Sequence, residues 1–128
     1  MTDHTRDLIL IASGGAVGSL ARHTVGRMVG PESGSGFPWH TFVVNVSGAF
    51  VLGLLLVIAA RQGWPGWWRP LLGVGLLGGY TTFSAFSLEA ADLILRGNVA
   101  LAAGYMTASA LSAVAGALAG IVLGRAVA

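Results

Sequence analysis

One short stretch, GGYTTFSAF at residues 78–86, combines glycines, hydroxyl side chains and phenylalanines inside a long apolar run. Its glycine pair lowers helical propensity, and its threonine hydroxyls compete for backbone hydrogen bonds. Irregular backbone at membrane depth is tolerated only where it is buried in protein or lines a wet cavity. The stretch therefore predicts a broken helix, and the freed carbonyls of Gly78 and Thr81 would suit a cation, especially opposite a second copy of the chain.

The same stretch carries side chains that suit a small anion. Phe83 and Phe86 are three residues apart and share a face of the helix that follows the break. A phenyl ring has a positive edge, which attracts an anion without binding it too strongly to release. The hydroxyls of Thr82 and Ser84 add hydrogen-bond donors. The alternative is that both phenylalanines simply face lipid or pack in the core.

A carboxamide lies inside the second apolar run. Asn45 offers two donors and one acceptor, and at helical spacing it shares a narrow polar face with Thr41 and Gly48. Polar groups are costly within a membrane and need a reason to be there. Two interpretations remain open: a hydrogen bond to another helix, or a contact with a permeating solute.

A row of hydroxyls runs along the last apolar segment. Tyr105, Ser109 and Ser112 follow one another at steps of four and three residues, with Gly116 four residues further, whereas Thr107 points elsewhere. Such a row could pass a solute along by donating hydrogen bonds in turn. Serine hydroxyls also satisfy nearby carbonyls and pack helices, so taken alone the row favours helix packing.

The charged residues near the ends of these segments have two interpretations. Arg22 could attract an anion at a vestibule or pair with a carboxylate, for which Glu89 and Asp92 are the candidates. Asp92 can also meet Arg96 four residues later. We found no nucleophile–base pair, phosphate loop or paired carboxylates, so an enzyme is not predicted.

These residues must be positioned by four membrane-spanning helices. The 128-residue chain is 55% hydrophobic and 9% charged, and each of its apolar runs is long enough to cross a bilayer. We expect an all-α integral membrane protein forming a single domain over residues 1–128. The predicted spans are 8–29, 41–60, 71–95 and 99–127, joined by turn-rich links at 30–38, 61–70 and 96–98.

Composition also limits the partners. The chain has no cysteine, which excludes disulfides and thiolate metal sites, and its net charge of +2 gives little support for nucleic-acid binding. Four arginines lie on the side of the termini and three toward the other side, a weak bias that allows insertion in both orientations. Four helices hardly enclose a pore, so an antiparallel homodimer is expected. Glycine pairs four residues apart predict close helix contacts: Gly14/Gly18, Gly75/Gly79, Gly116/Gly120 and Gly120/Gly124.

Three stretches together resemble the Fluc (CrcB) family of bacterial fluoride channels. They are GGAVGSLARH at 14–23, FPWHTFVVNVSGAFVLG at 37–53 and GLLGGYTTFSAFSLE at 75–89. They cover the first three helices in order, and the size and four-span layout match over nearly the whole chain. The fourth helix matches only through its hydroxyl row.

The resemblance implies a dual-topology antiparallel homodimer in the bacterial inner membrane, with two pores that let fluoride leave the cell passively. Within the family, the two motif phenylalanines line the pores and the helix-two asparagine contacts the ion. The carbonyls around the break hold a structural sodium ion at the dimer interface, and the helix-one arginine lies in the vestibule. On this chain these are Phe83, Phe86, Asn45, Gly78, Thr81 and Arg22, and the helix-four polar track is Tyr105, Ser109 and Ser112. Ala85 replaces a more usual small hydroxylated residue, which leaves the polar lining there undefined.

Two other functions are compatible with four small helices. A proton-coupled exporter of the small multidrug type would carry a carboxylate deep in the first helix, where this chain has Ser13, Gly14 and Gly15. A structural subunit of a larger membrane complex would explain the glycines but not the aligned polar row.

Overall fold

Four long helical segments make up the protein, for which the computed structural model describes residues 1–30 and 36–128. The segments long and apolar enough to span a membrane are Asp3–Val29, Trp39–Gln62, Arg69–Leu95 and Val99–Val127. This confirms the prediction of an all-helical chain with four spans, each of which extends to or slightly beyond the predicted apolar run. Most of the predicted 30–38 link lies outside the described residues.

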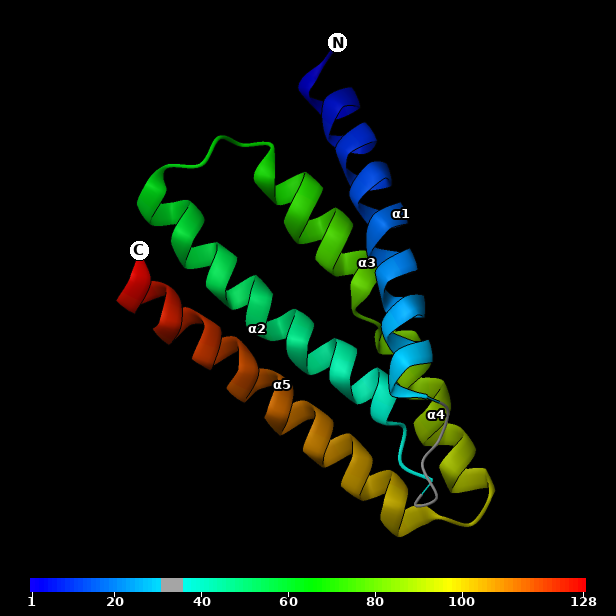
Figure 1. Ribbon diagram of the computed structural model, residues 1–128. Helices are drawn as coiled ribbons and strands as arrows, with labels where there is room; N and C mark the ends of the chain where they lie inside the picture. The colour runs from blue at the N-terminus through cyan, green and yellow to red at the C-terminus, as the bar shows by residue number, and fades with distance from the viewer. Residues whose placement is uncertain (31–35) are drawn as a thin grey trace.

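The helices pair into two layers (Figure 1). α1 (Asp3–Val29) packs on the first part of the third span, which comprises η1 (Arg69–Leu77) and α3 (Gly78–Tyr80). α2 (Trp39–Gln62) lies along α5 (Val99–Val127), and α4 (Phe83–Leu95) completes the third span and packs on α5.

Glycines make these contacts close. A Cβ added at Gly14 or Gly18 of α1 would overlap backbone atoms of η1, and one added at Gly120 of α5 would overlap the Phe50 carbonyl of α2. Without a hydrophobic force between helices in lipid, such backbone approach is what holds them together. The predicted role of the glycine pairs in tight packing is confirmed.

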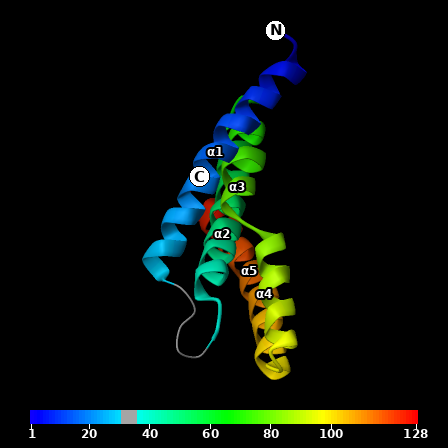
Figure 2. The same cartoon turned by 90° about the vertical axis from the view of Figure 1, so that its right-hand side faces the viewer.

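The third span is interrupted between α3 and α4. Thr81 (φ −84°, ψ 159°) and Thr82 (φ −149°, ψ 122°) have extended backbone, and Figure 2 shows α4 displaced sideways from the line of α3. The predicted break is therefore present. It lies at the threonines and not at Gly78 and Gly79, which stay helical, because the Thr82 side chain starts a new helix by accepting a hydrogen bond from the Ala85 amide (3.1 Å).

The segment before the break has an unusual winding. η1 is a π-helix in which the Gly78 amide donates to the Gly73 carbonyl, five residues earlier. Such wide turns are rare and often lie near functional sites. Sequence periodicity did not predict this element.

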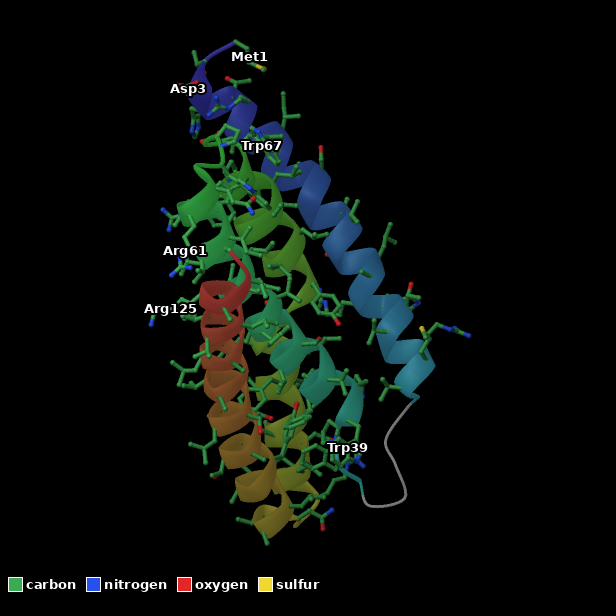
Figure 3. The ribbon with its side chains drawn as sticks, turned by 60° about the vertical axis from the view of Figure 1, so that its left-hand side comes forward. Met1, Asp3, Trp39, Arg61, Trp67 and Arg125 are labelled. Carbon is green, nitrogen blue, oxygen red and sulfur yellow. The ribbon has the colours of Figure 1, made fainter. Side chains whose placement is uncertain are left out.

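Most large side chains outside the helix contacts are apolar and exposed on the protomer, as expected for lipid contact. Figure 3 shows Trp39 and Trp67 near opposite ends of the bundle, where indoles meet the membrane–water boundary. Arg61 and Arg125 lie at the same end (Figure 3), where Arg61 Nη1 donates to the Arg125 carbonyl (2.7 Å). The ends of α2 and α5 are thereby fastened together.

Candidate functional site

The helix break is held by the carboxamide of Asn45 from α2. Asn45 Nδ2 donates to the Thr82 carbonyl (2.9 Å), and the Thr82 amide donates to Asn45 Oδ1 (2.8 Å). The Asn45 side chain thus takes the place of a backbone partner for the buried residue Thr82. Of the two interpretations of Asn45, the interhelical hydrogen bond is confirmed. The solute contact remains a prediction, which one unused Nδ2 hydrogen could serve.

This arrangement redirects two amides that would otherwise close helical turns. In a continuous α-helix the Gly78 carbonyl would accept from the Thr82 amide, and the Thr81 carbonyl from the Ala85 amide. Here the first amide donates to Asn45 and the second to Thr82 Oγ1. The break therefore leaves the two carbonyls predicted to hold a cation without their usual partners. Gly78 and Thr81 also border a small hollow of about 260 Å³ shared with Asn45.

The two predicted pore phenylalanines at the beginning of α4 differ in their exposure. Phe83 is 79% exposed on the protomer. Phe86 is half-buried between two rings, with ring centroids 5.5 Å from Phe83 and 5.1 Å from Tyr105. The Ser84 hydroxyl is exposed and lies 3.4 Å from Thr82 Oγ1. Phe86 thus connects the break to the hydroxyl row of α5, while Phe83 has a free face outside the protomer.

The first hydroxyl of the α5 row belongs to a carboxylate cluster. Tyr105 is fully buried and its OH donates to Glu89 Oε2 (2.9 Å), while Thr41 Oγ1 donates to Glu89 Oε1 (2.7 Å). His40 Nε2 lies 3.4 Å from the same Oε1 atom. The Glu89 side chain is 22% exposed. It is therefore a partly buried carboxylate whose two oxygens are held by hydroxyls from two other helices.

The other two hydroxyls of the row lie deeper along α5. Ser109 is 6% exposed, and its Oγ is buried without a hydrogen-bond partner among the described residues. Ser112 is half-buried and Thr107 is exposed, so the predicted face of the helix is confirmed. Buried hydroxyls in proteins usually have a partner, so the orphaned Ser109 oxygen indicates a group with capacity to bind.

Arg22 does not make the predicted pair with a carboxylate. Its Nε donates to the Gly79 carbonyl of α3 (3.1 Å), while both Glu89 oxygens are taken by hydroxyls from α2 and α5. That predicted pairing was wrong, because the Arg22 side chain binds the Gly79 carbonyl of the neighbouring α3 and not a carboxylate of α4. The alternative partner of Asp92 is confirmed, since Arg96 forms an ion pair with it.

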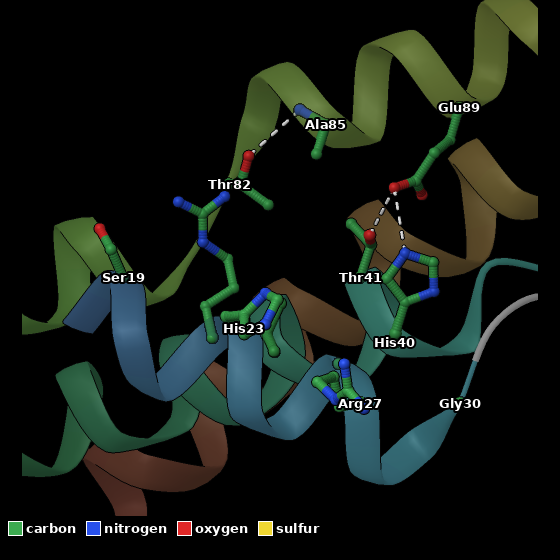
Figure 4. A pocket seen from close by; sticks show the side chains of 12 residues that line it. Ser19, His23, Arg27, Gly30, His40, Thr41, Thr82, Ala85 and Glu89 are labelled. Atoms are coloured by element: carbon green, nitrogen blue, oxygen red, sulfur yellow. Dashed lines mark hydrogen bonds and ion pairs between the residues drawn. The ribbon is translucent and has the colours of Figure 1, made fainter. Parts of the chain in front are cut away.

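A cavity of about 790 Å³ lies between α1, α2 and α4 (Figure 4), and of the residues above it is lined by Arg22, His40, Thr41, Thr82 and Glu89. Its polar lining combines cationic and neutral donors with a single carboxylate among the described residues. The charged and titratable members are Arg22, His23, Arg27, His40 and Glu89, and Thr41 and Thr82 add hydroxyls. An excess of positive charge at a half-open cavity draws anions toward it.

Sequence reasoning missed Thr41 and His40 as members of the site. Thr41 was placed on the polar face with Asn45, but nothing in its spacing pointed to a carboxylate 48 residues away. No role was predicted for His40.

Four spanning segments, one of them broken beside a cavity lined with donors, define a small polytopic membrane transport protein. The chain belongs to the CrcB-like protein family, Camphor Resistance (CrcB), whose model matches residues 9–121. This confirms the family suggested by the three motifs.

Relatives of the chain carry one common name. A protein of Caulobacter sp. (strain K31) is 47% identical over 120 residues, covering 92% of this chain and 94% of its own, and is named fluoride-specific ion channel FluC. Proteins of the same name from Rhodopseudomonas palustris (strain BisB5) and Agrobacterium fabrum (strain C58) are 47% and 44% identical. They cover 93% of this chain and 97% and 96% of their own lengths.

Proposed function

We propose that this protein is a passive, fluoride-selective channel of the bacterial inner membrane. The observation that carries this proposal is its similarity, over nine-tenths of its length, to relatives named fluoride-specific ion channels. That similarity favours the channel over the proton-coupled exporter and the assembly subunit. Ion passage through such a protein needs no enzymatic chemistry.

The donors along α5 and at the break suit fluoride. Fluoride is small, strongly hydrated and an avid hydrogen-bond acceptor, so its path must replace water with donors. We assign this role to the Asn45 amide and to the hydroxyls of Thr82, Ser84, Tyr105, Ser109 and Ser112. The unpartnered Ser109 hydroxyl supports the assignment, because its hydrogen-bonding capacity is not used within the described protomer. Hydroxyls bind more weakly than a ring of arginines would and so let the ion leave again.

Phe83 and Phe86 are proposed to line the same path. The 5.1 Å separation of the Phe86 and Tyr105 rings places an aromatic edge beside the hydroxyl row, which supports this role. On the isolated protomer Phe83 is 79% exposed to lipid or water. Its role in the path therefore requires a second protomer that covers the exposed face of the ring.

The vestibule of the path is the cavity that contains Arg22 and Glu89. A net positive lining attracts fluoride from solution, and Arg22 remains fixed there by its bond to Gly79. A negative-inside potential then drives the anion outward, at about 2.3 kcal/mol per elementary charge per 100 mV. Hydrofluoric acid that crosses the membrane and dissociates inside the cell would supply the exported ion.

We further propose an antiparallel homodimer with two pores and a structural sodium ion at its interface. The carbonyls of Gly78 and Thr81 fit a hard cation, because they are oxygen ligands that have lost their helical partners. A sodium ion bound there would neutralise the concentrated carbonyl dipoles. A small hollow beside these residues and the exposed Phe83 both favour contact with a second copy.

Ion efflux from liposomes containing the purified protein tests these proposals. Liposomes loaded with potassium fluoride and treated with valinomycin should release fluoride rapidly, whereas matched liposomes loaded with potassium chloride should retain chloride. Efflux that depends on a pH gradient would support the exporter instead, and absence of fluoride efflux would support the assembly subunit. Replacing sodium by N-methylglucamine on both sides should abolish fluoride efflux if the sodium ion is structural.

A further inference from the structure

His40 is the one described histidine that contacts the carboxylate of the cavity. Its Nε2 lies 3.4 Å from Glu89 Oε1, the oxygen that also accepts from Thr41 (2.7 Å), and Figure 4 shows the histidine and threonine side chains reaching the same atom. The other ring nitrogen, Nδ1, is buried and has no hydrogen-bond partner among the described residues. A change in the charge of the His40 ring would therefore act most directly on Glu89.

The groups around His40 determine how its charge affects the cavity. Among the described residues, the titratable and charged groups facing the cavity besides His40 are Arg22, His23 and Arg27 from α1 and Glu89 from α4. Tyr105 of α5 donates to the same carboxylate from the side of α5. Thr41 and Tyr105 satisfy Glu89 with neutral hydroxyls, which leave its negative charge in place. A neutral imidazole likewise leaves a net negative group at the cavity wall, whereas a protonated imidazole cancels it.

We propose that His40 sets the charge of the anion-entry site, so that fluoride enters the cavity more readily when this imidazole is protonated. The inference rests on the proposed fluoride conduction. Histidine is the side chain that proteins use to change charge with pH, so pH is the variable that tests the inference. Acidification is also the condition under which more fluoride crosses membranes as hydrofluoric acid, so export would rise when the load rises.

The test is the pH profile of fluoride efflux at equal pH inside and outside the liposomes. Valinomycin-driven efflux is measured at half-unit steps from pH 8.0 to 6.0, and the rate in protein-free liposomes is subtracted to remove leakage of hydrofluoric acid. Between these limits the wild-type rate should rise roughly threefold or more, as expected for removing a charge beside an anion path. A flat profile in a protein that conducts fluoride at pH 7.5 would overturn the inference while leaving the proposed function intact.

Three single variants assign the effect to one ring. His40→Gln should give a flat profile at the low rate of the wild type at pH 8.0, and His40→Lys should give a flat profile at the high rate. His23→Gln removes the other histidine of the cavity, and it should keep the rise, as should His4→Gln at the exposed start of α1. A rise that persists in both His40 variants, or that disappears in His23→Gln, would contradict the assignment. Gel filtration confirms that each variant is folded before its rate is compared.

Discussion

Asn45 and Thr82 form a closed pair in which the carboxamide of one residue occupies both backbone hydrogen-bonding groups of the other, at 2.9 and 2.8 Å. One side chain from α2 therefore holds the point where the third span changes direction. The pair unites two functions predicted from sequence, a helix break and a polar side chain inside the membrane, in a single contact.

Breaking this pair should impair both stability and conduction. Asn45→Asp keeps an acceptor for the Thr82 amide but loses the donor to the Thr82 carbonyl and adds a negative charge beside an anion path. We expect a loss of about 1–3 kcal/mol of stability and a fall in fluoride efflux of at least tenfold. The matched control is Asn98→Asp at an exposed position without a side-chain cap, which should change neither quantity. Normal efflux in Asn45→Asp would contradict a pore role for the carboxamide.

Removing one hydroxyl from Glu89 should weaken the entry cluster. Tyr105→Phe deletes a hydrogen bond to a partly buried carboxylate, which contributes about 1.5–3 kcal/mol. Thermal unfolding in detergent should register the loss, and fluoride efflux should fall several-fold because the row loses its first hydroxyl and Glu89 loses the group that holds it in place. Tyr80→Phe removes a hydroxyl that contacts Ser47 and not Glu89, so it should leave efflux nearly unchanged. Equal efflux in both variants would argue against the hydroxyl row as the path.

Phe83 separates a pore role from a packing role. Because its side chain is 79% exposed on the protomer, Phe83→Ile should cost the protomer little stability yet abolish most fluoride efflux. Leu88→Ile changes another exposed side chain of α4, 72% exposed, and should preserve efflux. If Phe83→Ile conducts as well as Leu88→Ile, Phe83 faces lipid in the working protein.

The glycine contact between α1 and the third span should be intolerant of a methyl group. A Cβ at Gly18 would overlap the Leu76 carbonyl, so Gly18→Ala should destabilise the protein by about 1–3 kcal/mol, measured by thermal unfolding in detergent. Gly104→Ala meets no atom within 4 Å and should be neutral or slightly stabilising, because alanine favours the helix. Comparable stability of the two variants would mean that the helices separate easily to accept the side chain.

Dual insertion can be measured directly because the chain has no cysteine. Asn98→Cys places a single thiol in the exposed turn before α5, near Gly97 with its φ of 84°. A membrane-impermeant maleimide applied to intact cells should label about half of the protein, and the remainder should react only after permeabilisation. Labelling that is nearly complete or nearly absent in intact cells would establish one fixed orientation.

Hydropathy and small residues predicted most of the fold. The four spans follow from long, predominantly apolar runs, and GGYTTFSAF indicated that the third one breaks. Two features could not be predicted because they depend on which helices become neighbours. The spacing of Asn45 specifies its own face but not its partner 37 residues later, and the charge of Arg22 suggested a carboxylate although a backbone carbonyl lies closer. The π winding of η1 has no periodic signature in so short a segment.

That winding sets the rotational phase of everything after it. A π turn holds nearly one residue more than an α turn, so each residue of η1 turns the chain less than a residue of an α-helix would. If the same nine residues were wound as an α-helix, the following helix would be rotated about its axis relative to its present orientation. Thr82 would then turn away from Asn45, and the aromatic side chains of α4 would turn toward a different neighbour. The wide winding of η1 thus acts as the angular spacer that brings the break into alignment.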